Sequence, residues 1–346
     1  MRNRSILIAV CFLLLLAAAG SFGESAGQYS TGWLKIGMGA RAMALGDAYT
    51  AVADDVSAVY WNPAGLSTIN YGQLMLQYSL WFADTGYHAF AFCHPLSKSG
   101  ERVKSSLGAG LVYLDYGSIL RTTDLASTQN ISPEYFSSNS FMGILSYSRV
   151  VMKSLWFGAT AKYFSDTIDN TSAGGMAADA GILFKPEEIL TLGAAVQNIG
   201  PSLYSHALPY TVRAGAQIKL APFLLTAGAS QSSGADPQTS MGVELKANKS
   251  LALRFGYLFS MPDTGSGGVL PRGVSFGFGI NHFRNLGIDI ALAGWGGLGY
   301  RLTPLENPLR ISLYYYFEPL EMLMNKEAYE PEYFDKDEVP ANYFWK

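Results

Sequence analysis

The residues best suited to chemistry crowd one stretch near the N-terminus, Gly39 to Leu66, with the sequence GARAMALGDAYTAVADDVSAVYWNPAGL. Carboxylates and amides of this kind cap helices, and Asn before Pro favours a tight turn. Glycine permits backbone conformations or close approaches that a side chain forbids. The pattern indicates a compact, turn-rich plug with a structural or gating role. The residues that we expect to form the plug or gate are Gly39, Arg41, Gly46, Asp47, Asp54, Asp55, Trp61, Asn62, Pro63 and Gly65.

Residues of catalytic or metal-binding type do not form a recognisable site in the sequence. The four histidines are scattered, and His88 and His94, which would share a strand face, lie about 20 Å apart along it. No G-x-S-x-G nucleophile elbow is present. The G-x-G-x-x-A match that begins at Gly37 lacks a βαβ context. We therefore expect no enzymatic activity, no metal and no cofactor.

A second set of charged residues lies in segments that alternate apolar with polar or small residues. In residues 210–220, for example, Arg213 and Lys219 share one face while Val212 and Ile218 share the other. A charge that faced lipid at mid-bilayer would cost roughly 2–4 kcal/mol. We therefore expect charged residues in such segments to face the interior of a barrel. These lumen-facing candidates are Lys162, Arg213, Lys219, Glu244, Lys246, Arg254, Asp289 and Arg310.

The elements that must position these side chains are β-strands, because a period of two dominates the chain from Gln73 onward. Alternating segments of about ten residues are typical of membrane barrels. The sequence therefore predicts an all-β fold, a 14-stranded antiparallel transmembrane β-barrel with an N-terminal plug. The predicted strands lie near 73–81, 86–94, 105–117, 139–148, 154–165, 175–184, 190–198, 209–219, 223–231, 239–247, 250–259, 273–281, 286–294 and 309–317.

The lengths of the connections support a barrel over a soluble sandwich. Links after strands four, six, eight, ten and twelve are short, as expected of periplasmic turns, whereas extracellular loops are longer. This alternation predicts that the plug, the short turns and the C-terminus lie on the periplasmic side. The connections 82–85 and 95–104 break the rule. The longer connections are 118–138, 166–174, 199–208, 260–272 and 295–308.

Composition and the N-terminus indicate an exported membrane protein. The chain is 49% hydrophobic and only 15% charged, yet no segment after the first 23 residues has the roughly 18 apolar residues of a spanning helix. Residues 1–23 have the charged start, short apolar run and small-residue end of a signal peptide; an uncleaved anchor is the alternative. Cys93, the one cysteine beyond that segment, is expected to pack as a small hydrophobe. A net charge of −3 argues against a nucleic-acid partner.

The plug motif also carries a resemblance. The runs GARAMALGDAYTAVADD and SAVYWNPAGL resemble the N-terminal signature of the PorV/PorQ family, which is itself similar to FadL-type barrels with an NPA turn in a hatch. The resemblance continues in AVQNIGP, LPYTVRAGAQ and RGVSFGFGI, which begin at Ala195, Leu208 and Arg272. It implies a 14-stranded barrel with an internal plug, surrounded by lipid of the bacterial outer membrane after signal-peptide cleavage.

The resemblance leaves the function open between two main alternatives. As in FadL-type barrels, the chain would take up or move hydrophobic small molecules. As in PorV-like proteins, it would act as a shuttle or cargo-binding component of type IX secretion with a periplasmic or secretion-system protein partner. A structural barrel is a third alternative. Strand glycines either open a lateral exit or pack the wall against the plug; these are Gly108, Gly110, Gly158, Gly277 and Gly279.

The predicted organisation is a signal peptide at 1–23, a plug at 24–70, a barrel at 71–317 and an acidic, aromatic-rich periplasmic tail at 318–346. The tail follows Phe317, which corresponds to the terminal Phe of the last strand in many barrels. It is either a solvated appendage or a docking segment whose aromatic side chains anchor a partner.

Overall fold

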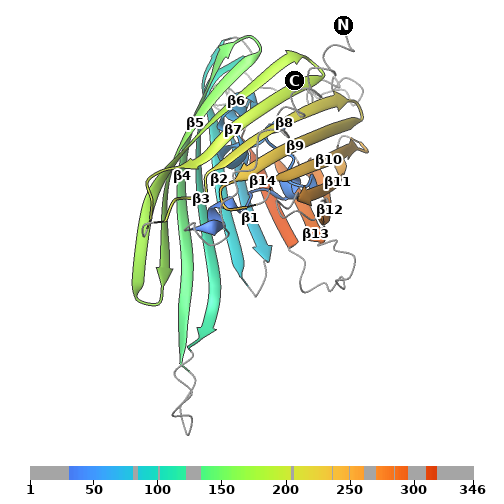
Figure 1. The fold of residues 1–346 in the computed structure, drawn as a ribbon. Coiled ribbons are helices and arrows are strands. Elements are labelled where there is room, and N and C mark those ends of the chain that lie inside the picture. Colours follow the sequence, from blue (N-terminus) through green and yellow to red (C-terminus); the bar gives the residue numbers. More distant parts are fainter. Residues whose placement is uncertain are drawn as a thin grey trace, which may run out of the picture.

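The chain folds into a closed barrel of fourteen described antiparallel strands, as predicted, in which neighbours in sequence pair and β1 pairs with β14 (Figure 1). The predicted signal peptide and tail lie outside the described residues. This computed structural model describes residues 31–80, 85–99, 102–121, 134–203, 206–235, 237–248, 250–260, 270–283, 285–294 and 309–317. The strands are β1 (Gln73–Leu80), β2 (Gly86–Ser99), β3 (Arg102–Leu120), β4 (Tyr135–Met152), β5 (Leu155–Ile168), β6 (Thr171–Glu187), β7 (Leu190–Ile199), β8 (Thr211–Leu220), β9 (Phe223–Ser232), β10 (Gln238–Lys246), β11 (Leu251–Ser260), β12 (Leu270–Phe283), β13 (Leu286–Gly294) and β14 (Leu309–Tyr316).

The wall has an apolar outer face and a polar inner face. In β14, Arg310 and Ser312 are buried inside, whereas Leu313, the next residue, is 49% exposed. The same alternation exposes Leu76 on β1 and Phe255 on β11. Such a face suits lipid, because the wall's backbone groups are satisfied by strand pairing and the exposed side chains of its middle part are mainly apolar. Among the described helices, none is long and apolar enough to cross a membrane.

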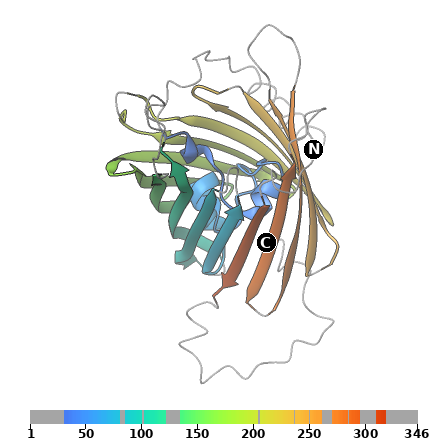
Figure 2. The ribbon, with the colours of Figure 1, turned by 90° about the horizontal axis from the view of Figure 1, so that it is seen from below.

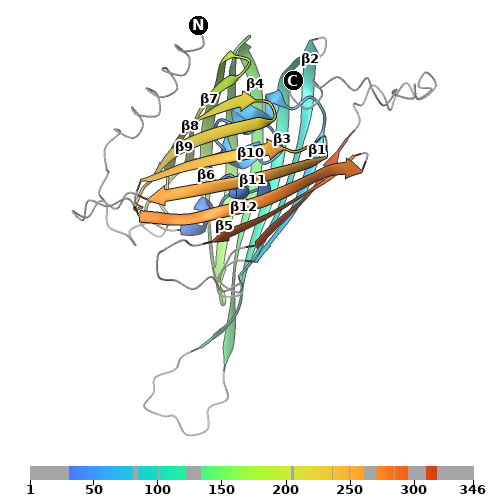
Figure 3. The same ribbon diagram turned by 90° about the vertical axis from the view of Figure 1, so that its right-hand side faces the viewer.

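The strands differ in length and tilt. β3, β4 and β6 have 19, 18 and 17 residues, whereas a transmembrane strand needs about 9–11. The β3–β4 and β5–β6 hairpins therefore project beyond the rest of the barrel, at the bottom of Figure 1. On the other side of the molecule, β8–β12 run obliquely across the direction of β2–β4 (Figure 3).

Two predicted connections are wrong because these long strands occupy them. Most of 95–104 belongs to β2 and β3, which end at Ser99 and begin at Arg102. Most of 166–174 belongs to β5 and β6, whose turn is only Asp169 and Asn170. At the β5–β6 end both faces carry exposed or half-exposed side chains, so the burial contrast that produces a period of two is missing there. At the β2–β3 end Val103 is buried, but its neighbours in the sequence are nearly all polar, which hides the alternation. The corrected β2–β3 connection is short, like the other turns on its side.

The plug fills the interior of the barrel, where Figure 2 shows it in blue. It consists of four short helical pieces: η1 (Gly32–Lys35), α2 (Ala40–Ala44), α3 (Ala58–Trp61) and η2 (Pro63–Thr68). Tyr49, Tyr60 and Trp61 are its largest fully buried side chains, at most 1% exposed. They join one apolar cluster with wall residues such as Met75 and Cys93. Cys93 is a free, buried thiol. The plug and wall therefore share a core.

Candidate functional site

The NPA turn fixes the plug through the Asn62 side chain, which is fully buried. Its Oδ1 accepts the backbone N–H of Ala64 at 3.2 Å, the local bond expected for a turn of this type. Its Nδ2 donates to the carbonyl oxygens of Thr50 at 2.9 Å and Ile182 at 3.0 Å. Asn62 thus joins two plug segments to β6. Pro63 begins η2, where its missing N–H costs nothing.

The three glycines of the motif have different roles. Gly39 and Gly46 have φ angles of 91° and 65°, a region that side chains rarely adopt. Gly65 is not in that region, so of the two roles expected of these glycines, a special backbone conformation or a close approach, it serves the second. A Cβ at Gly65 would overlap the carbonyl oxygen of Ala53. Gly65 is therefore needed because two plug segments touch there.

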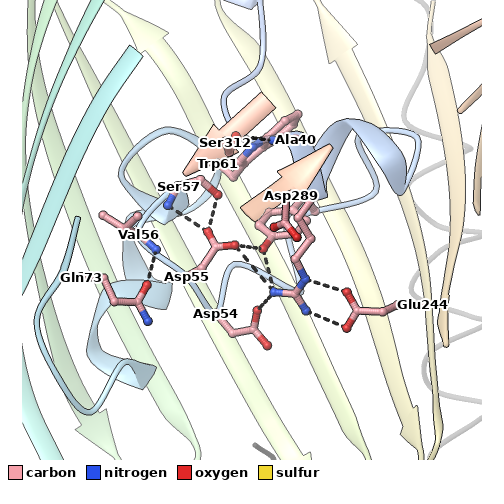
Figure 4. Close-up of polar contacts among 12 residues, drawn as sticks. Ala40, Asp54, Asp55, Val56, Ser57, Trp61, Gln73, Glu244, Asp289 and Ser312 are labelled. Carbon is pink, nitrogen blue, oxygen red and sulfur yellow. Dashed lines mark hydrogen bonds and ion pairs between the residues drawn. The ribbon is translucent and has the colours of Figure 1, made fainter. Parts of the chain in front are cut away.

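Arg41 is the centre of an ion-pair network between plug and wall. Its partners Asp54, Asp55 and Glu244 are labelled in Figure 4. Its guanidinium binds Glu244 of β10 through two bonds of 2.7 and 3.2 Å. The same group contacts Asp54 at 2.5 Å and Asp55 at 3.7 Å within the plug. It also donates to the Tyr49 hydroxyl at 3.0 Å. A planar guanidinium suits this task, because it donates to several acceptors at once.

The network continues along the inner wall as alternating charges. Glu244 also accepts from Arg254 of β11 at 2.7 Å, and Arg254 in turn contacts Asp289 of β13 at 2.7 Å. At the other end, Lys219 of β8 lies 3.4 Å from Asp54. All the charged residues of this network are among the plug or lumen-facing candidates named from the sequence. Lys246, the further lumen-facing candidate on β10, is partly buried beside it.

Asp54 and Asp55 are adjacent but differ in protonation chemistry. Burial raises the pKa of both carboxyls. Arg41 and Lys219 more than offset burial at Asp54, so its pKa lies below its usual range. Asp55 is bonded by Ser57 and by Tyr49 at 2.5 Å, yet burial dominates and its pKa is raised. Asp47 lies in the turn after α2 with a φ of 62°, so its place is set by the backbone.

A second polar cluster holds the opposite side of the plug. Lys162 of β5 and Asp179 of β6 form a fully buried ion pair of 2.7 Å, and Lys162 lies 5.3 Å from the centre of the Tyr60 ring. Arg213 of β8 stacks 4.9 Å over Trp61. It also donates to Gln197 at 2.7 Å, and the amide of Gln197 donates to the carbonyl oxygen of Tyr60.

A third set of contacts lies where β14 meets β1. Gln77 accepts the backbone N–H of Gly39 at 2.5 Å, and Ser312 accepts that of Ala40 at 2.9 Å. Arg310 donates to the carbonyl oxygen of Gly39 at 3.2 Å. These groups satisfy the start of α2, which no side chain of the plug caps. All eight lumen-facing candidates are therefore inside the barrel, and most contact the plug or one another.

The rest of the wall meets the plug through backbone contact at glycines. One glycine from each strand between β5 and β12 is so close to the plug that a Cβ would touch it; we call this set the glycine girdle. Gly158 would overlap Pro63 and Ala64, and Gly277 would come within 2.5 Å of Ala44. At Gly158 and Gly277 the structure therefore supports close packing of the wall against the plug rather than a lateral exit. The girdle is Gly158, Gly181, Gly193, Gly215, Gly228, Gly242, Gly256 and Gly277.

Sequence reasoning missed several partners of the plug. Asp179 sits at an inward position of a predicted strand, so the alternation that identified Lys162 was a sufficient signal for it. Gln77, Gln197 and Ser312 are neutral, and a polar residue inside a barrel gives no sign that it bonds the plug. In the described part of the chain, no group of three His, Cys, Asp or Glu residues is placed to hold a metal.

The fold is similar to solved barrels that transport hydrocarbons. The Pseudomonas putida toluene transporter TodX has 15% identity and a TM-score of 0.60, with 82% of this chain and 99% of that chain covered. The CymD monoaromatic hydrocarbon channel has 11% identity and a TM-score of 0.62, covering 82% and 98%. A Pseudomonas aeruginosa FadL homologue has 14% identity and a TM-score of 0.53, covering 87% and 100%. At such identities the likeness shows the fold.

Comparison with curated proteins found no match. A family model does match, over residues 17–207, which include the plug motif and the strands from β1 to β7. Its description is an uncharacterised protein family, UPF0164. The match covers more than half of the chain, and the chain therefore belongs to the UPF0164 family.

Proposed function

We propose that the protein is a plugged channel of the bacterial outer membrane, of FadL-like type, that moves hydrophobic small molecules. The observation that carries this proposal is a plug held inside a lipid-facing barrel by reversible polar contacts, chiefly those of Arg41 with Glu244 and of Gly39 and Ala40 with β1 and β14. The fold likeness to TodX and CymD supports it, since those proteins carry toluene and monoaromatic hydrocarbons by their descriptions. Monoaromatics are therefore the first ligands to test.

The passage in this proposal lies on the β14–β1 side of the plug. Backbone packing against the glycine girdle fixes the plug along β5–β12, where movement would have to separate closely packed chains. Around Gly39 and Ala40, by contrast, the contacts to Gln77, Ser312 and Arg310 are single hydrogen bonds. The two neutral bonds are each worth about 0.5–1.5 kcal/mol, and the bond from the Arg310 guanidinium about 1.5–3 kcal/mol. This segment is the part of the plug that yields at the lowest cost.

A reversible tether tests the proposal. Ala40→Cys and Ser312→Cys, combined in a Cys93→Ser background, place thiols on two neighbouring residues, since the Ala40 backbone N–H lies 2.9 Å from the Ser312 hydroxyl. Entry of labelled toluene is measured into liposomes that contain the purified variant. Reduced protein should accelerate entry over protein-free liposomes, and oxidation should abolish the acceleration until reductant is added.

Two outcomes contradict the proposal in different ways. Equal entry with and without the barrel would refute transport of monoaromatics. Acceleration that persists in the oxidised state would keep transport but refute the passage beside Ala40. The same variant without the Ser312→Cys change is the matched control, because it can be oxidised without forming the tether.

A PorV/PorQ-type role in secretion is the second candidate. The motif from Gly39 to Leu66 favours it, as do the hairpins that extend beyond the membrane-spanning part of the wall. In that case a partner protein would co-purify with the barrel equally well in both redox states of the tethered variant. Fractionation of cells, with the N-terminal sequence of the mature chain, would test outer-membrane location and signal-peptide cleavage.

A further inference from the structure

The β5–β6 hairpin has an open edge outside the membrane-spanning part of the barrel. β6 pairs with β5 from Phe184, opposite Leu155, to Thr171, opposite Ile168. Its pairing with β7 begins only at Ala178, opposite Ile199. Residues 171–177 therefore have no paired neighbour on that side among the described residues. Seven residues of strand span about 23 Å, and this length projects past β7 (Figure 1).

The projecting part lies beyond the bilayer. β7 has 10 residues, which is the length of one membrane crossing. The β6 residues from Ala178 onward lie beside it, and residues 171–177 continue past its end at Ile199. They continue toward the side of the long β3–β4 connection, which the loop lengths assign to the cell exterior.

The alternation of backbone groups identifies which residues face the open edge. Lys185 donates its N–H to Ser154, just before β5, at 2.8 Å. In a regular strand, residues of the same parity turn their N–H and C=O toward the same neighbour. The even-numbered residues Ser172, Gly174 and Met176 therefore face away from β5. Gly200 lies directly against the carbonyl of Met176, which leaves Ser172 and Gly174 as the open positions.

This edge lacks the usual protection against pairing. Proteins shield exposed edges with Lys or Pro, with a bulge, or with a covering segment. Residues 171–177 read TSAGGMA, without a charge or a proline, and their register with β5 is regular. An unshielded edge in an exported protein is a template for another strand.

We propose that the β6 edge around Ser172 and Gly174 binds an extended segment of another polypeptide, which adds to the sheet as a further strand. A second copy of this chain does not fit. Barrels in one membrane share an orientation, so a twofold axis along the membrane normal would place each N–H opposite the same N–H of the other copy. The occupant is therefore a different chain. This inference is independent of transport through the barrel.

The side chains around the edge indicate the kind of segment. The Tyr163 side chain of the neighbouring strand is 50% exposed, and its hydroxyl end lies over Gly174. On the same face, Thr167 and Ser172 bond through their hydroxyls at 2.9 Å. An aromatic or β-branched residue of the added strand would pack beside the exposed Tyr163 ring, as side chains of neighbouring strands do on one face of a sheet. The expected ligand is an uncharged peptide with alternating Thr and Tyr or Val.

The experiment uses the purified full chain in detergent and fluorescein-labelled nonapeptides of alternating Thr and Tyr or Val. Ser172→Pro removes the N–H at the open edge and leaves the β5 pairing in place. Ser172→Ala is the matched control, because it loses the same hydroxyl but keeps the N–H. We expect fluorescence anisotropy to show binding to the wild type and the Ala variant, and about ten-fold weaker binding to the Pro variant.

Two further measurements make the outcome decisive. A peptide N-methylated at two adjacent central residues loses an N–H on each of its edges and should not bind. In the free protein, the amides of Ser172 and Gly174 should exchange with deuterium faster than those of Ala173 and Gly175. Equal affinity of the Pro and Ala variants, no binding by any of the nonapeptides, or slow exchange at Ser172 and Gly174 would each overturn the proposal.

Discussion

Asn62 illustrates how the plug is stabilised at the level of single residues. The plug has only short helical pieces, so many of its backbone groups lack partners within a helix or a strand. Asn62, Gln77, Gln197 and Ser312 supply those partners from side chains. A buried backbone group without a partner costs about 1–3 kcal/mol. These neutral side chains therefore matter to the position of the plug as much as the charged ones.

Substitutions in the NPA turn should displace the plug without preventing the barrel from forming. Gly65→Val inserts a side chain where even a Cβ would overlap the carbonyl of Ala53. Asn62→Leu removes three hydrogen bonds. We expect each to cost roughly 1–3 kcal/mol and to make residues 50–66 accessible to protease.

The matched control for these variants is Gly32→Ala, since a Cβ at Gly32 meets no atom within 4 Å. Heat-modifiable mobility in gels should persist in all three proteins, because the wall closes its own hydrogen bonds. Protease resistance of residues 50–66 in both turn variants would refute the role assigned to the turn.

Arg41→Gln should loosen the plug more than any surface charge change. It leaves Glu244 and Asp54 with one cation fewer, and breaking a buried pair in this way costs about 3–5 kcal/mol. Arg121→Gln breaks the exposed pair of Arg121 and Asp169 and should have little effect. Amide exchange of α2 reports the difference. Equal exchange in the two variants would contradict the central place of Arg41.

At the level of elements, alternation was enough to identify all fourteen strands. Arg213 and Glu244 had to face inward once their neighbours were recognised as lipid-facing. The ends of β5 and β6 at their shared turn were missed because neither face is buried there. Pairings such as Arg41 with Glu244, 203 positions apart, depend on how far the plug turns inside the barrel. No local sequence pattern encodes that rotation of the plug.

The turns on the two ends of the barrel should differ in accessibility. In a Cys93→Ser background, Asn170→Cys in the β5–β6 turn should react with a membrane-impermeant maleimide on intact cells. Asn248→Cys, in the β10–β11 turn, should react only after the outer membrane is opened. The reverse result would invert the orientation inferred from loop lengths. Ser127 and Gly267, in the longer predicted loops, lie outside the described residues and should label like Asn170.

At the scale of the whole molecule, the barrel ends in a seam that does not need the tail. Phe317 donates its N–H to Gly72 at 2.8 Å, and its ring contacts Phe92 and Tyr315 at centroid distances of 5.9 and 4.8 Å. These contacts join β14 to β1 and β2 before the tail begins. The closure of the wall is therefore complete at Phe317.

Deletion of residues 326–346 should leave assembly and heat-modifiable mobility unchanged. Phe317→Ala, by contrast, should lower the temperature at which the barrel unfolds in a gel-shift series. Truncation of a buried Phe typically costs about 3–5 kcal/mol, and because the Phe317 ring is partly exposed, we expect a smaller cost here. Loss of the folded form on tail deletion would show that the tail belongs to the assembly signal. Loss of function with folding intact would favour the docking interpretation of the tail.

The glycine girdle sets the order in which plug and wall come together during biogenesis. From Ala44 to Ala64 the plug chain passes one strand after another, from β12 back to β5, and meets a glycine on each. A finished cylinder this tightly filled has no entrance for Tyr49, Tyr60 and Trp61. The N-terminal segment, made first, must already be in place when the strands close, and it acts as the template around which the cylinder is built.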